Sequence, residues 1–405
     1  MERSSVEKAA ATPNPTPGEN KNKNTTSNSK KQRPGPCGWL REHRVSLLTR
    51  HKRRLVEVPY TATIADTANA LQANCVSAMA VAAPPGRWIG AGGTMILESD
   101  PATGAVRKHY IGMVTMLDIL VHIAEAGVKG GGKWEEMDLN QSMMVPVSSV
   151  IGHSLEGLSL WTLNPNTSIM DCMETFSKGV HRALVPIGSQ TDNSLPVELV
   201  ESSPGYKMVT QMDVIRFLQE SSHELKDILS SSIQALDAIN ENVFAVAKNT
   251  KVDEVIKTMR AASLTAVPVV DADGVELLQD GRGKRVVETF SASDLRDCPM
   301  AQLQSWLGLT VTEFKEKVGA LKATLTPEGG TAISDVQQSP KLITSFPENS
   351  LKEVIEMVVV NHVHRVWVVD RQSLLLGLVS LTDILRAVRE SALKMDQDMQ
   401  GIVSQ

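Results

Sequence analysis

Cysteine is scarce in this sequence and never clustered. The four cysteines, Cys37, Cys75, Cys172 and Cys298, lie far apart, and none belongs to a CxxC motif. Their spacing argues against a structural zinc site and against a disulfide scaffold, and it suits a reducing compartment. No apolar run approaches the roughly 18 residues that a bilayer-crossing helix needs. Because the N-terminus also lacks the apolar core of a secretory signal, we expect a cytoplasmic protein that does not enter the membrane.

Aromatic residues are few, and neither sign of charge is in large excess. Only 4% of the residues are aromatic, so the core of this 405-residue chain must rest on aliphatic side chains and methionine. The net charge of −5 reflects 41 basic and 46 acidic residues, which gives no electrostatic reason to expect nucleic acid or a membrane surface as the main partner. The length predicts two or three domains.

The N-terminal region differs from the rest of the chain. Residues 1–36 are rich in Asn, Lys, Ser, Thr and Pro and contain almost no large apolar side chains, which predicts a disordered tail. Residues 37–54 include WLREHRVSLLTRHKRR, which predicts a short amphipathic helix with a basic end. Such a cluster can direct nuclear import, although a basic cluster that leads into a folded domain is more often a solvated face.

A short motif occurs four times in the remaining sequence. Residues 111–120, IGMVTMLDIL, predict a strand that runs directly into a helix, where Thr115 and Asp118 have the spacing of a capping box. The same combination of strand, hydroxyl residue and aspartate recurs at Thr210–Asp213, Ser291–Asp294 and Ser380–Asp383. One box indicates only a capped helix, whereas four boxes after four β-rich runs indicate one structural unit used four times.

Each unit contains a second, earlier box that opens its first helix. These boxes are Thr63–Asp66, Ser168–Asp171, Thr250–Asp253 and Ser350–Glu353. Valine- and proline-rich strands follow the first helices, so each unit is predicted as β-α-β-β-α. The period of roughly 80–95 residues is too long for a solenoid and indicates small α/β units that pair through their sheet and helix faces.

The predicted boundaries follow from these repeats. We expect a tail at 1–36, a basic segment at 37–54, repeat one at 55–125, a Gly-rich connector at 126–145, repeat two at 146–222, repeat three at 230–298, a connector with a helix at 299–335, repeat four at 336–392 and a tail at 393–405.

The four units resemble the cystathionine-β-synthase (CBS) domain. Four of them in one chain, with VHRVWVVD at 363–370 in the last, resemble the γ-type regulatory subunits of AMP-activated and SNF1-related protein kinases. The opening LVEVPYTATIADTANAL at 55–71 and the loop PPGRWIGAGG at 84–93 are similar to the plant γ-subunit-like branch. The resemblance covers about residues 55–390 and leaves out both tails.

The resemblance implies a fold and a function. It implies an α+β fold in which four CBS repeats form two tandem pairs (Bateman modules) that assemble into a disc. It implies partners, the α-type catalytic and β-type scaffold subunits of a kinase. It also implies AMP, ADP or ATP as regulatory ligands in clefts between paired repeats, with no required cofactor. We call the box that opens the last helix of each repeat its terminal box. The aspartate of each terminal box would then accept hydrogen bonds from ribose hydroxyls, while His-Arg pairs would face the phosphates.

The candidate ligand-binding residues are assigned on that basis. They are Thr115, Asp118, Thr210, Asp213, Ser291, Asp294, Ser380 and Asp383 in the boxes, the pairs His181–Arg182 and His364–Arg365, and Thr250. The simpler alternatives are that each aspartate only caps its helix and that Thr250 is a plain N-cap. Repeats one and three depart from the family, because Ser77 and Ser263 stand where a basic residue is expected. We therefore expect one or two competent clefts rather than four.

No pattern in the sequence nominates a catalytic or metal site. The run GAGG at 90–93 lacks the Lys-Ser/Thr ending of a phosphate-binding loop, and the nine histidines show no HExxH spacing. The segments outside the repeats are too short and polar to hold a catalytic domain. We expect a non-catalytic regulatory subunit, and the alternative is a CBS scaffold that works through protein contacts without sensing nucleotide.

Overall fold

The computed structural model describes residues 35–84, 86, 88–89, 95–96, 108–129, 138–154, 157, 160–187, 205–272, 277–296, 298, 300–325 and 342–403. Everything below concerns the unit Gly35–Gln405. Nearly all of the predicted tail at 1–36, the centre of the connector at 126–145, the end of the connector at 299–335 and the start of repeat four lie outside the described residues.

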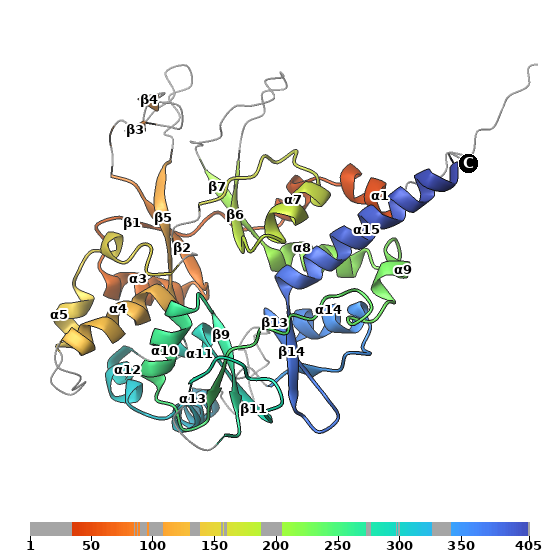
Figure 1. Ribbon diagram of the computed structural model, residues 1–405. Coiled ribbons are helices and arrows are strands. Elements are labelled where there is room, and N and C mark those ends of the chain that lie inside the picture. Colours follow the sequence, from red (N-terminus) through yellow and green to blue (C-terminus); the bar gives the residue numbers. More distant parts are fainter. Residues whose placement is uncertain are drawn as a thin grey trace, which may run out of the picture. The chain divides into compact units, whose positions relative to one another are not determined.

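The order β-α-β-β-α recurs four times along the chain (Figure 1), with the first strand reduced in repeat two. Repeat one consists of β1 (Glu57–Pro59), α3 (Ile64–Ala73), β2 (Ala78–Ala82), β5 (Tyr110–Thr115) and α4 (Met116–Lys129), with the short pair β3 (Trp88–Ile89) and β4 (Met95–Ile96) between β2 and β5. Repeat two consists of α7 (Ile169–Phe176), β6 (Arg182–Pro186), β7 (Tyr206–Thr210) and α8 (Gln211–Glu220). Its first strand is reduced to a parallel bridge between Thr162 and Leu184.

The second half of the chain repeats this order. Repeat three consists of β8 (Ala245–Ala247), α10 (Val252–Ala261), β9 (Ala266–Val270), β10 (Leu277–Leu278), β11 (Val286–Ser291) and α11 (Ala292–Arg296). Repeat four consists of β12 (Thr344–Ser345), α14 (Leu351–Val360), β13 (Arg365–Val369), β14 (Leu375–Ser380) and α15 (Leu381–Val403). The predicted α+β class with four β-α-β-β-α repeats is confirmed. The helix α15 runs on through the position at which the C-terminal tail was predicted to start.

The strand pairing has one register in all four repeats. The second strand pairs antiparallel with the last strand, and its first residue lies opposite the hydroxyl residue of the terminal box. These pairs are Ala78–Thr115, Arg182–Thr210, Ala266–Ser291 and Arg365–Ser380. The terminal boxes therefore occupy equivalent corners, at which a buried strand ends and a helix begins.

The turn after each first helix is also equivalent. Its left-handed residue is Cys75, Gly179, Ser263 or His362, with φ between 51° and 90°. In repeats one, three and four the next residue closes the helix by donating its N–H back to a carbonyl of the last turn, the bond that a Schellman motif makes. This register corrects one prediction. Ser263 is the left-handed turn residue, whereas Thr265 holds the position that His181 and His364 hold in repeats two and four.

The repeats pair through their sheets and again through their helices. Repeats one and two share a small sheet core that includes Tyr110 and Tyr206. Repeats three and four share another around Trp367, whose indole N–H donates to the Thr289 hydroxyl at 2.7 Å. The helices combine differently: α4 of repeat one packs on α10 and α11 of repeat three, and α7 and α8 of repeat two pack on α14 and α15 of repeat four. The prediction that copies pair through both kinds of face is confirmed.

Short helices connect and flank the repeats. The predicted single helix at the basic segment is instead two helices, α1 (Pro36–Glu42) and α2 (Val45–Thr49), because extended residues at His43 and Arg44 interrupt it. The connectors contain α5 (Leu139–Met143), a 3-10 turn (Val147–Ser149) and α9 (Lys226–Leu229). The connector after repeat three forms α12 (Met300–Leu307) and α13 (Val311–Leu325), which bury apolar side chains against repeats one and three. Within the described residues, no helix is long and apolar enough to cross a membrane.

Candidate functional site

In each terminal box, the hydroxyl residue donates two hydrogen bonds to the same carboxylate oxygen of the aspartate. In repeat one the backbone N–H and the hydroxyl of Thr115 donate to Oδ2 of Asp118 at 2.8 and 2.6 Å. The same two bonds to Oδ2 form in the pairs Thr210–Asp213, Ser291–Asp294 and Ser380–Asp383. The surroundings of the other oxygen, Oδ1, therefore decide whether each carboxylate can accept a hydrogen bond from a ligand.

Asp118 is satisfied by its own chain. Its Oδ1 accepts the backbone N–H of Ser154 at 2.6 Å, and the residue is fully buried. Gly157 covers the same oxygen, because a Cβ built there would lie 3.4 Å from Oδ1 and 2.9 Å from the Met113 carbonyl oxygen. Burial raises the pKa of Asp118, against the lowering effect of the bonds from Thr115 and Ser154. Both oxygens of Asp118 thus accept hydrogen bonds from the chain itself, Oδ2 from Thr115 and Oδ1 from Ser154.

Oδ1 of Asp294 also accepts a hydrogen bond from another residue of the chain. Lys315, on α13, donates to Oδ1 of Asp294 at 2.9 Å, and the two side chains are 8% and 0% exposed. Burial raises the pKa of Asp294, and the Lys315 ammonium group opposes this shift. Two of the four predicted acceptors therefore make their second set of contacts inside the protein.

Asp213 and Asp383 are the more accessible carboxylates. Oδ1 of Asp383 has a long contact of 3.4 Å with the Arg386 guanidinium on the same helix. Oδ2 of Asp213 accepts from the Lys52 ammonium at 2.5 Å, and Lys52 also donates to the Met208 carbonyl at 2.7 Å. In the described part of the chain, no donor is bonded to Oδ1 of Asp213.

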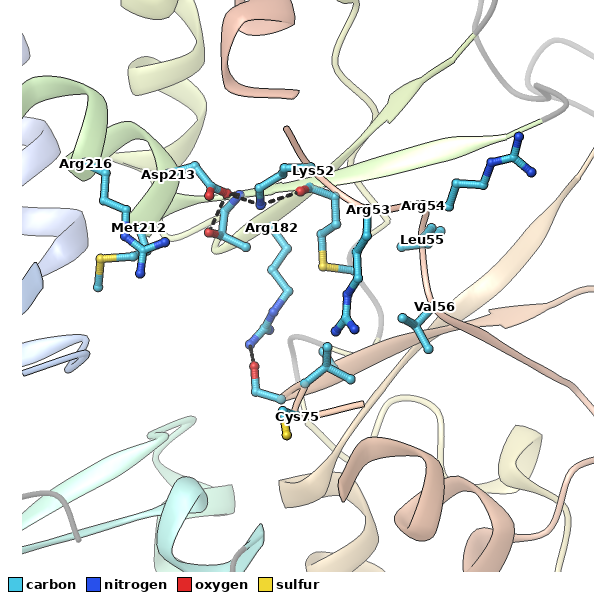
Figure 2. Close-up of a pocket in the computed structure, with 15 residues that line it drawn as sticks. Lys52, Arg53, Arg54, Leu55, Val56, Cys75, Arg182, Met212, Asp213 and Arg216 are labelled. Carbon is cyan, nitrogen blue, oxygen red and sulfur yellow. Dashed lines mark hydrogen bonds and ion pairs between the residues drawn. The ribbon is translucent and has the colours of Figure 1, made fainter. Parts of the chain in front are cut away.

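A cavity of about 440 Å³ lies at Asp213, between repeats one and two. Figure 2 shows the side chains around it. Its walls are Lys52, Arg53, Arg54, Leu55, Val56, Cys75, Val76, Ser77, Ala78, Arg182, Met208, Thr210, Met212, Asp213 and Arg216. Five of these side chains are cationic and one is a carboxylate, while the aliphatic residues and methionines supply apolar surface. We call this cavity the first cleft.

Three predicted residues meet in the first cleft: Arg182, Thr210 and Asp213. Arg182 reaches from the start of β6 across to repeat one and donates to the Ser77 hydroxyl at 3.1 Å. Ser77 thus stands where a basic residue was predicted, and it accepts a hydrogen bond from Arg182 of the partner repeat. His181 is half-buried beside it, and its carbonyl accepts the Gln211 N–H at 3.1 Å.

The matching pair in repeat four makes an equivalent contact with repeat three. Arg365 donates to the Ala266 carbonyl at 3.0 Å and to the hydroxyl of Thr265. His364 is exposed, and its carbonyl accepts the Leu381 N–H at 3.1 Å. The arginine of each even repeat therefore contacts the residue that precedes, or begins, the second strand of its partner repeat. The structure brings Ser380, Asp383 and this pair to the second pair of repeats, apart from the first cleft.

The predicted box Thr250–Asp253 is wrong. Lys251 is the N-cap of α10 and, like the N-caps Thr63, Ser168 and Ser350, makes an antiparallel bridge, but lysine has no acceptor with which to cap a helix. Thr250 is fully buried, and its hydroxyl has no hydrogen-bond partner among the described residues. Asp253 accepts from Lys257 at 2.9 Å instead. Contact of Thr250 with a nucleotide stays a prediction.

Sequence comparison with known proteins assigns the chain to a family. The chain is 50% identical to the Arabidopsis thaliana SNF1-related protein kinase regulatory subunit gamma-like PV42a over 353 residues, which cover 85% of this chain and 94% of that protein. The chain belongs to this gamma-like family. It is also 48% identical to the Arabidopsis protein PV42b over 368 residues, covering 89% of this chain and 98% of that protein. The CBS domain model matches residues 235–278 and 333–390.

A solved structure supports the fold of this gamma-like chain. The Methanocaldococcus jannaschii protein MJ1225, described as a putative archaeal homolog of g-AMPK, superposes with a TM-score of 0.55 at 20% identity. The match covers 85% of this chain and 99% of that one. At this identity the likeness concerns the fold alone. The predicted resemblance to γ-type CBS proteins is confirmed.

Sequence reasoning missed most of the cations of the first cleft. Lys52, Arg53 and Arg54 belong to the basic cluster before repeat one, which the sequence analysis favoured as a solvated face. Arg216 lies on α8, one turn after Asp213, and its guanidinium is 3.4 Å from Nδ1 of His362 in repeat four. The basic run was visible in the sequence of this gamma-like chain, but its place at the cleft depends on packing between distant segments.

Proposed function

We propose that this protein is a non-catalytic, gamma-like regulatory subunit of an SNF1-related protein kinase complex. The observation that carries the proposal is 50% identity across 94% of a protein that bears this description. The partners are then α-type catalytic and β-type scaffold kinase subunits. Affinity purification of the tagged full-length chain from plant cells tests this. Recovery of kinase α and β subunits supports the proposal, and their consistent absence contradicts it.

We further propose that an adenine nucleotide, AMP, ADP or ATP, binds in the first cleft. Its volume of about 440 Å³ falls within the range of small-molecule sites. Arginine and lysine side chains are suited to phosphate, and the N-terminus of α8 adds a positive dipole end at Thr210 and Asp213. Oδ1 of Asp213 can accept from a ribose hydroxyl, while Val56, Met208 and other apolar side chains offer surface to a base.

Thermal melting with adenine nucleotides tests the ligand. A ligand at a hundred times its dissociation constant stabilises the folded state by about 2.7 kcal/mol, which raises the melting temperature by several degrees. Arg182→Ala should reduce this rise by about half, because losing one charge-assisted contact weakens binding by about tenfold and leaves the ligand at about ten times its dissociation constant. Arg365→Ala is the matched control, since it changes the equivalent residue of repeat four and leaves the first cleft intact. No rise with any adenine compound would remove the sensing part of the proposal.

A scaffold without nucleotide sensing is the second candidate. It is favoured by the internal contacts that occupy the predicted acceptors: Ser154 on Asp118, Lys315 on Asp294, and Lys52 on Asp213. On this account, CBS pairs hold kinase subunits together and no adenylate enters. Assembly with kinase subunits together with unchanged melting in AMP, ADP and ATP is the combination that favours it.

A further inference from the structure

The first cleft receives cations from outside the four repeats. Lys52, Arg53 and Arg54 lie between α2 and β1, in the segment that leads into repeat one, and all three line the cleft. Repeats one and two themselves supply Arg182 and Arg216. A cleft formed by the two repeats alone would therefore contain two of its five cations, and the leading segment supplies the other three.

Lys52 neutralises the one carboxylate that lines the cleft. Its ammonium group contacts Oδ2 of Asp213 and is held there by the Met208 carbonyl, while Oδ1 stays open to a ribose hydroxyl. The described residues that line the cleft include four further cations and no second carboxylate, so the cleft has an excess of positive charge. Phosphate oxygens can accept from Lys52 without displacing it from Asp213, and such charge-assisted bonds are the stronger ones.

Two arginines around Lys52 contact neutral groups. Arg53 donates to the Asn74 carbonyl at 2.7 Å, and Arg216 contacts the His362 ring. In Figure 2, Arg53 and Arg182 both extend toward the side of the cleft where Cys75 lies, while Arg54 points away. An anion offers Arg53 and Arg216 stronger, charge-assisted bonds than these neutral groups do.

From this arrangement we infer that the first cleft recognises a polyphosphate chain more than a nucleoside. The ligand class is an anion with two or three linked phosphates, so ATP and ADP bind more tightly than AMP, and inorganic triphosphate binds without any base. The inference rests on the proposed nucleotide site, and it assigns recognition to the phosphate chain of the nucleotide. Lys52 and Arg53 are the specificity-determining residues.

The expected selectivity follows from the number of contacts. AMP carries one phosphate, whereas ATP carries three and therefore offers more oxygens and more negative charge to the five cations that line the cleft. Even one additional charge-assisted contact strengthens binding by roughly tenfold or more. We therefore expect ATP to bind at least about tenfold more tightly than AMP.

Isothermal titration calorimetry on the full-length protein tests this, with adenosine, AMP, ADP, ATP and inorganic triphosphate in magnesium-free buffer. Arg53→Ala should weaken the affinity for ATP by about tenfold and should change the affinity for AMP by less than about threefold. Arg50→Ala is the matched control, because it removes a cation three residues away that does not line the cleft, and it should change neither affinity. Melting curves without ligand verify that both variants fold.

The outcomes separate this inference from the proposed nucleotide site. If AMP and ATP bind equally, or Arg53→Ala weakens both to the same degree, the phosphate preference is overturned and the nucleotide site stands. If triphosphate binds and no adenine nucleotide does, the nucleotide site is overturned and phosphate recognition stands. If none of the five compounds binds, both are overturned.

Discussion

Replacing Lys315 by methionine should destabilise the protein through Asp294. The substitution keeps most of the apolar stem and removes the charge that lies 2.9 Å from Oδ1 of a fully buried carboxylate. Removing one partner of a buried ion pair costs about 3–5 kcal/mol. We expect the lower end, about 3 kcal/mol, because Asp294 keeps both bonds from Ser291. Lys317→Met, an exposed residue on the same helix, should change stability by less than about 0.5 kcal/mol.

The loss in Lys315→Met should depend on pH with a defined sign. Burial already raises the pKa of Asp294, and removing the ammonium group removes the main opposing effect. The folded state then binds a proton more tightly than the unfolded state, whose aspartate titrates near about 4. The free energy of unfolding of the variant should therefore fall as the pH rises from about 4 through the raised folded pKa. At low pH the variant should approach the wild type.

Thermal and urea unfolding of both variants between pH 5 and pH 8 measure this effect. A loss of about 3 kcal/mol corresponds to a fall in melting temperature of several degrees for a chain of this size. Adding Asp294→Asn to Lys315→Met should recover at least half of the loss, because it removes the unpaired charge. If Lys315→Met is as stable as Lys317→Met at every pH, the conclusion that Lys315 neutralises a buried Asp294 is refuted.

Two further substitutions test the packing that positions the repeats. Thr289→Val should cost about 1–3 kcal/mol by leaving the buried indole N–H of Trp367 without its acceptor, and urea unfolding followed by tryptophan fluorescence measures it. A stability equal to wild type would show that another group can take this bond. Gly377→Ala should cost about 1–3 kcal/mol because its Cβ would lie 2.7 Å from the Asn240 carbonyl oxygen, which thermal melting detects. An unchanged melting temperature would mean that the Asn240 segment can move away freely.

The local parts of the site could be predicted from the sequence. A hydroxyl residue followed three positions later by an acid sets a strand-to-helix corner through contacts within four residues, so the terminal boxes at Thr115, Thr210, Ser291 and Ser380 are confirmed. The recurrence of that corner predicted the fold class. The same reasoning failed at Thr250, because the helix begins one residue later and its N-cap is Lys251, which the capping-box pattern does not recognise.

The availability of each aspartate could not be predicted, because it depends on distant residues. Ser154 is 36 positions from Asp118, and Lys52 is 161 positions from Asp213. No periodicity or spacing rule connects such residues, since tertiary packing alone brings them together. For the same reason the basic cluster before repeat one was favoured as a solvated face, although the structure places three of its cations at the first cleft.

Alkylation of Cys75 tests most directly whether the first cleft is the ligand site. Cys75 is exposed and lines that cleft, whereas the other three cysteines are buried, so the native protein has one readily accessible thiol. Saturating ATP should slow its alkylation by at least about tenfold, because bound ligand leaves only a small fraction of clefts open. If ATP raises the melting temperature while Cys75 reacts at an unchanged rate, the nucleotide binds elsewhere and the central claim is contradicted.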